Sequence, residues 1–148
     1  MQMISDLYTG GILDAAAAIP AATRLENPQA TATKVSRVCG SEVEVDLSMA
    51  DGVVSEFGMT ARACALGQAS ASIVARNILG TSPHELYALR NQMREMLKEG
   101  GTPPVGERWK DLSMLASISD YPQRHASTLL IFEAVCACLD KLDVPNTR

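Results

Sequence analysis

The fold is decided by residues 42–52, which read EVEVDLSMADG. Apolar residues alternate with polar ones over the first eight positions, and this period of two predicts a strand with one buried face and one solvent-facing side. The strand ends at Asp51-Gly52, a dipeptide preferred in tight hairpin turns because both positions tolerate positive φ. A second strand over residues 53–61 and a shorter edge strand over 31–38 complete a small three-stranded antiparallel sheet. The side chains expected to be buried on the second strand are those of Val53, Phe57, Met59 and Ala61.

Segments with helical periodicity flank this sheet on both sides. Apolar residues recur at spacings of three and four over residues 5–19 and again in the segment that follows Cys64. Residues 82–85, Ser-Pro-His-Glu, form a capping box with proline at the first helical position. A short helix is expected around Trp109, and a final helix is expected after Pro122. The order of helix, sheet and then helices predicts an α+β fold, with about five helices packed on the sheet in a single domain of residues 1–148.

Composition excludes several classes of protein. The chain has 148 residues, of which 47% are hydrophobic, and this content is typical of a folded globular domain. The formal net charge is −4, so electrostatics give no reason to expect nucleic acid or anionic lipid as the main partner. No segment approaches the roughly 20 apolar residues that a membrane span requires. We therefore expect a cytoplasmic protein, without nucleic acid or membrane as a partner.

The four cysteines are too few for a disulfide scaffold in a chain of this length, so their thiols are expected to be reduced. Cys39 ends the first predicted strand, and Cys64 follows the third. If the strands form a meander, both positions come to one end of the sheet, and a two-thiol site is geometrically plausible there. Isolated cysteines are, however, more often buried small hydrophobes than ligands. Cys136 and Cys138 fall on the final helix, where both are expected to be core or surface thiols.

Two cysteine-containing segments carry a family resemblance. Cys39-Gly40-Ser41, followed by the predicted hairpin and then by residues 63–72, ACALGQASAS, resembles the NifU/IscU/SufU-type iron–sulfur cluster assembly scaffold family. The segment from Tyr121 to Arg124 resembles the part of that family that carries a third cysteine. The long helical insertion over residues 81–120 is similar to the SufU-type branch. The resemblance covers nearly the whole chain and implies the α+β fold of that family.

The resemblance implies four ligand positions, of which two are replaced in this chain. The family's Cys-Gly-Asp aspartate falls on Ser41, and its third ligand cysteine falls on Ser127. Cys39 and Cys64 are then the surviving ligands for iron, an iron–sulfur cluster or zinc. A neutral serine hydroxyl is a poor substitute for a thiolate or a carboxylate, because these metals prefer sulfur and imidazole donors. A site built from one chain is therefore short of ligands.

Two additions would supply the missing ligands. His125 precedes Ser127 by two residues, so that a shifted helix start brings its imidazole toward the site; the alternative is a surface histidine near a helix N-terminus. A homodimer would instead contribute Cys39 and Cys64 from each chain, which gives a four-thiolate site between subunits. Cys138 is excluded, because eleven residues of helix at about 1.5 Å per residue place it about 16 Å from Ser127.

The function implied by the resemblance is that of an assembly scaffold or carrier rather than an enzyme. Its expected partners are a cysteine desulfurase and the rest of the iron–sulfur assembly machinery. One alternative is a degenerate family member that acts as a protein-interaction module without a cluster. Another is a sulfur acceptor of the sulfurtransferase type, in which Cys64 is the nucleophile, because the dipole of a helix N-terminus favours a thiolate. A basic stripe of Arg90, Arg94 and Lys98 is most simply a solvated helix face, though such a stripe also suits an acidic partner.

Overall fold

The computed structural model describes residues 12–13, 16, 24–37 and 40–142. Its sheet is a meander with strand order β1-β2-β3, formed by β1 (Ala30–Val35), β2 (Glu42–Ala50) and β3 (Val53–Arg62). Both pairs are antiparallel, as the sequence predicts. The α-helices are α2 (Ala65–Asn77), α3 (Pro83–Glu99) and α4 (His125–Lys141), and two 3-10 segments, η2 (Lys110–Asp120) and η3 (Pro122–Arg124), precede α4.

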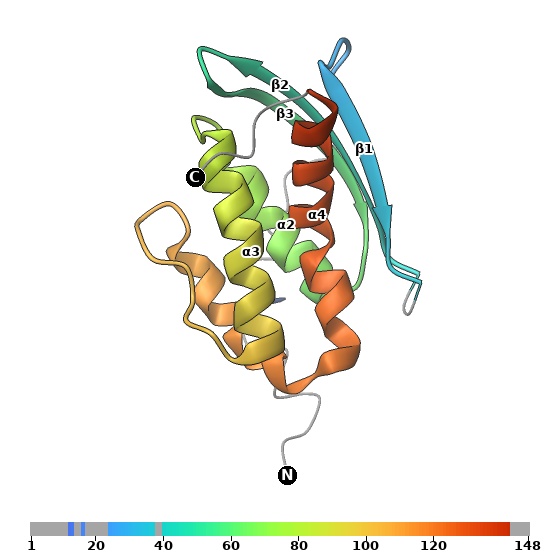
Figure 1. The fold of residues 1–148 in the computed structure, drawn as a ribbon. Coiled ribbons are helices and arrows are strands. Elements are labelled where there is room, and N and C mark those ends of the chain that lie inside the picture. Colours follow the sequence, from blue (N-terminus) through green and yellow to red (C-terminus); the bar gives the residue numbers. More distant parts are fainter. Residues whose placement is uncertain (1–11, 14–15, 17–23, 38–39, 143–148) are drawn as a thin grey trace.

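The helices cover one face of the sheet (Figure 1). Helix α4 contacts β1 and β2, while α2 contacts β3 and packs beside α4. Helix α3 lies on the outer side of α4 and also contacts η2. The core between these layers is built from aliphatic side chains, among which Val45, Leu47, Leu66 and Ile73 are completely buried. The predicted α+β class is confirmed; the described residues contain α2, α3 and α4 together with the two 3-10 segments, against the roughly five helices expected.

Two predictions of burial on the sheet are wrong, one on β3 and one on β2. The register shifts between Ser48 and Met49, which pair with Glu56 and Val54, so that one residue of β3 is left over. This β-bulge reverses the alternation, and Val54 is buried in place of the predicted Val53.

The face of β2 that the sequence predicts to be exposed to solvent is also partly covered. Asp46, a polar residue of the alternating pattern, is only 1% exposed. Its carboxylate accepts hydrogen bonds from the guanidinium of Arg24, the backbone N–H of Leu25 and the hydroxyl of Thr31. The segment before β1 therefore folds over this side of the sheet.

The helix boundaries follow from the predicted caps and spacings. The hydroxyl of Ser82 accepts a hydrogen bond from the backbone N–H of Glu85, as the capping box predicts. The segment after Trp109 is a 3-10 helix rather than the ordinary helix expected, and its buried residues Leu112, Leu115 and Ile118 are spaced by three, which is the period of a 3-10 helix. Of the helix predicted over residues 5–19, Ile12, Leu13 and Ala16 are helical, and the remainder lies outside the described residues.

Candidate functional site

The start of α2 meets the start of α4 at one end of the molecule. Cys64 is the residue that precedes α2, and its extended backbone makes it the N-cap; its side chain makes no capping hydrogen bond. Ser127 lies in the first turn of α4 and is 1% exposed. The Cys64 Sγ and Ser127 Oγ atoms are 3.6 Å apart although 63 residues separate them in the chain. The structure therefore brings together the second cysteine and one of the two serines singled out in the sequence.

Close backbone packing fixes this contact. A Cβ atom at Gly67 would lie 2.7 Å from the Ala63 Cβ and 3.1 Å from the Ser127 carbonyl oxygen. A methyl group at this position would force the Ala63 side chain to shift and would press against the Ser127 carbonyl. Sequence reasoning missed Gly67, although a glycine in the first turn of a helix, where it costs stability, is a signal of such close approach.

A buried hydroxyl adds a second link between the helices. Ser70 is fully buried, and its Oγ donates to the Thr128 carbonyl at 2.9 Å. The Thr128 and Ser127 hydroxyls in turn donate to the carbonyl oxygen of Arg124 at 2.9 and 3.2 Å. Hydrogen bonds within the protein therefore position the Ser127 and Thr128 hydroxyls at the start of α4.

The turn between β1 and β2 lies at the same end of the sheet as the end of β3 (Figure 1). Glu42 pairs with Arg62, which is two residues before Cys64. The Ser36 N–H donates to the Ser41 carbonyl at 2.8 Å, and the Gly40 N–H donates to the Ser36 carbonyl at the same distance. Ser41 itself is buried. Cys39 lies outside the described residues, so the predicted approach of its thiol to Cys64 stays a prediction.

His125 is the first residue of α4 and is 8% exposed, so it is not the surface histidine of the alternative reading. Its Nε2 atom lies 3.0 Å from the Ile118 carbonyl oxygen and 3.2 Å from that of Ser119. Because carbonyl oxygens only accept, these contacts require a proton on Nε2, and in a neutral imidazole Nδ1 would then carry the lone pair. Within the part of the chain that the structure describes, no three side chains of His, Cys, Asp or Glu come together as a metal site.

Cys136 and Cys138 are expected from the sequence to be core or surface thiols, and the structure places both in the core. The Cys136 Sγ is 3.8 Å from the Leu86 carbonyl oxygen, and the Cys138 Sγ is 3.4 Å from that of Val45. Burial raises the pKa of Cys136 to about 12 and the pKa of Cys138 to about 11. Both groups are therefore protonated and unreactive near neutral pH.

Among the described residues, no helix combines the length and the apolar character needed to cross a membrane. No family model matches the chain. A curated relative, the iron–sulfur cluster assembly scaffold protein IscU of Thermotoga maritima, is 26% identical over 139 residues, which are 94% of this chain and 96% of the relative.

Solved structures extend this similarity. A protein from Fervidobacterium islandicum, described as an iron–sulfur cluster assembly scaffold for the SUF system, shares the fold with a TM-score of 0.81 at 19% identity. The match covers 90% of this chain and 97% of that protein's chain. The N-terminal part of a NifU-like protein from Brucella abortus has a TM-score of 0.92 and 46% identity, over 96% of this chain and 98% of that one. At that identity and coverage, this chain belongs to the NifU/IscU/SufU family of iron–sulfur cluster assembly scaffold proteins.

Proposed function

We propose that this protein is a non-enzymatic scaffold in iron–sulfur cluster assembly, and that it holds iron, a cluster or zinc as cargo through Cys39 and Cys64. The observation that carries the proposal is the 3.6 Å contact between the Cys64 Sγ and the Ser127 Oγ. It supports the assignment of Ser127 to a position where the resemblance implies a ligand. The relatives named as assembly scaffolds support the process.

The side chains that one chain can supply as metal ligands limit how tightly it can hold this cargo. Ser127 offers a neutral hydroxyl, and the proton on the Nε2 of His125 is directed to backbone carbonyls, which leaves Nδ1 as the atom for a third ligand. Two thiols and neutral groups do not complete a four-thiolate site within one chain. We therefore propose that a tightly held cluster requires a homodimer, and that a monomer holds its cargo loosely.

Iron uptake and the visible spectrum test this proposal. Anaerobic reconstitution of the wild-type protein should give an intense thiolate-to-iron band, and Cys64→Ala should abolish it. Cys136→Ala is the matched control, because it removes a thiol from the core and should leave the band unchanged. A wild-type protein that takes up neither iron nor zinc would contradict the scaffold function and favour the interaction module without a cluster.

Cys64 also supports a second candidate function, that of sulfur acceptor from a cysteine desulfurase. Its side chain is partly exposed and stands at the N-terminus of α2, where a sulfur donor on a partner can reach it. The thiolate would attack the outer sulfur of a persulfide on the desulfurase; the donor's S–S bond breaks, its thiolate leaves, and the new persulfide stays on Cys64.

Mass spectrometry after incubation with a desulfurase and cysteine tests this step. The expected product is a tryptic peptide containing Cys64 that is heavier by one sulfur atom and reverts on reduction. Absence of added sulfur on that peptide, with the desulfurase shown to be active, would reject the acceptor function while leaving metal uptake to be judged separately.

A further inference from the structure

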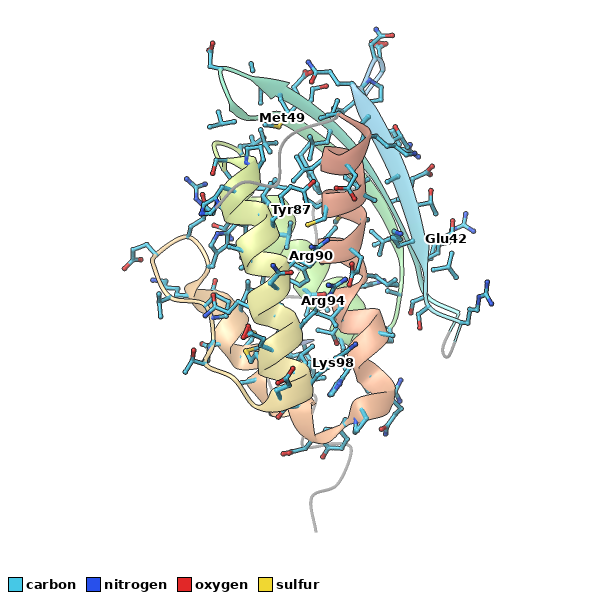
Figure 2. All side chains as sticks on the ribbon, in the orientation of Figure 1. Glu42, Met49, Tyr87, Arg90, Arg94 and Lys98 are labelled. Atoms are coloured by element: carbon cyan, nitrogen blue, oxygen red, sulfur yellow. The ribbon has the colours of Figure 1, made fainter. Side chains whose placement is uncertain are left out.

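A basic groove runs between the edge strand β1, the outer helix α3 and α4. The groove has a volume of about 330 Å³, and its charged lining comprises Lys34, Arg94, Lys98 and Glu133. A second hollow of about 400 Å³ shares Lys98 and Ala126 with it and continues toward Pro122. Figure 2 shows Arg90, Arg94 and Lys98 following one another along α3, on the side next to α4. The basic stripe expected from helical spacing therefore borders a groove rather than a flat, solvated helix face.

The charges in this groove are only partly compensated. The guanidinium of Arg94 donates to both carboxylate oxygens of Glu133 at 2.7–2.9 Å, so this pair is close to neutral. In the described residues, no acidic side chain pairs with the ammonium group of Lys34 or Lys98, and both residues are exposed. The groove thus carries two free positive charges on a chain whose net charge is −4.

Apolar side chains form the rest of the groove. Its lining includes Ala126, Leu129 and Leu130 of α4; Ala126 is exposed, and the two leucines are buried beneath it. Val35, at the end of β1, is 54% exposed beside them. An apolar floor between lysines suits a peptide that places one apolar side chain between carboxylates, because the charges steer the encounter and the apolar contact adds affinity.

We propose that this groove binds an acidic segment of a partner protein, with at least two carboxylates flanking an apolar residue. Nucleic acid is a weaker match, because the positive charge is local and the overall charge of the chain repels a polyanion. Ser36 lines the groove and also closes the turn between β1 and β2. The bound segment would therefore lie beside the turn that carries position 39 in the sequence. The proposal stands without the proposed function, since the groove contains neither Cys64 nor Ser127.

Fluorescence anisotropy with two labelled ten-residue peptides tests the proposal without any metal. The acidic probe contains Asp and Glu around a central Leu, and the neutral probe has Asn and Gln at the same positions. The acidic probe should bind at least about tenfold more tightly than the neutral one, with an affinity that falls as salt is added. Lys34→Glu and Lys98→Glu should each weaken binding at least about fivefold.

Lys110→Glu is the matched control, because Lys110 is an exposed lysine on η2 outside the groove lining. It should weaken binding less than about twofold. In nuclear magnetic resonance spectra of the labelled protein, the acidic probe should shift the amide signals of Val35, Ala126 and Leu129. The proposal is overturned if the two probes bind alike, if neither binds, if Lys110→Glu weakens binding as much as Lys98→Glu, or if an oligonucleotide displaces the acidic probe at equal charge concentration.

Discussion

Replacement of Ser127 by cysteine should return a third thiol to the candidate site and raise the zinc affinity of the protein. The Ser127 Oγ lies 3.6 Å from the Cys64 Sγ. Two sulfurs that each lie about 2.3 Å from a tetrahedral zinc are about 3.8 Å apart. The side chain at position 127 is therefore already at the separation that two ligands of one ion require.

The size of the gain follows from the free energy of zinc binding. Structural zinc sites provide about 10–16 kcal/mol from four ligands, which is about 2.5–4 kcal/mol per ligand. The Ser127 hydroxyl donates to the Arg124 carbonyl, and loss of that hydrogen bond costs about 1 kcal/mol. The net gain is about 1.5–3 kcal/mol, so Ser127→Cys should bind zinc about 10- to 150-fold more tightly than the wild-type protein.

Anaerobic competition with a chromophoric zinc chelator measures this change. Ser113→Cys is the matched control, because the Ser113 hydroxyl donates to a carbonyl three residues earlier, as that of Ser127 does, but is exposed on η2. Adding Cys64→Ser to Ser127→Cys should cancel the gain. The reasoning is refuted if Ser127→Cys binds zinc no more tightly than Ser113→Cys, or if its gain survives the loss of Cys64.

Three further predictions concern stability and thiol reactivity. Gly67→Ala should lower the free energy of unfolding by about 1–3 kcal/mol in urea titrations, because its methyl group would overlap the Ala63 side chain and press against the Ser127 carbonyl; an unchanged midpoint would contradict the close packing. The Arg24 guanidinium holds the pKa of Asp46 at about 2, below its ordinary 3.8. This pair should therefore contribute about 2 kcal/mol of stability that is complete above pH 4 and lost as the pH falls through 2. Asp46→Asn should accordingly destabilise the protein at pH 7 and have little effect near pH 2, and an equal effect at both values would rule this out. Iodoacetamide at pH 8 should modify Cys64 but neither Cys136 nor Cys138 until urea is added, as read by peptide mass spectrometry, and equal labelling of the folded protein would show that the core thiols are accessible.

The sequence predicts the local parts of the fold and misses what distant segments impose. Alternation over residues 42–49 and the Asp51-Gly52 turn predict β2, β3 and their pairing, because these features act between neighbours in the chain. The bulge opposite Ser48 cannot be derived from alternation, since periodicity within one strand does not specify its register with another. Asp46 reads as solvent-facing because the pattern carries no information about Arg24, which lies 22 residues earlier and covers it.

The candidate site likewise contains features that the sequence predicts and features that depend on distant segments. Spacing alone leaves Cys39 and Cys64 as two isolated thiols, and the family resemblance is what assigns Ser127 a place beside Cys64. The position of the His125 ring could not be predicted, because it depends on the carbonyls of Ile118 and Ser119 at the end of η2. Their orientation follows from the 3-10 geometry of that segment, which ordinary helical periodicity does not distinguish from an α-helix.

The geometry of the site does not depend on a ligand. Gly67 allows the backbone of α2 to approach the Ser127 carbonyl, and the Ser70 hydroxyl donates to the Thr128 carbonyl across the same junction. These contacts are made by buried residues that carry no metal-binding group, so they hold the two helix starts together with or without cargo. If Ser127 stands where the family has a ligand cysteine, as the resemblance implies, the replacement changes the chemistry of the side chain while leaving its place in the fold intact. We therefore expect a single substitution at position 127 to alter metal binding without altering the packing of α2 against α4.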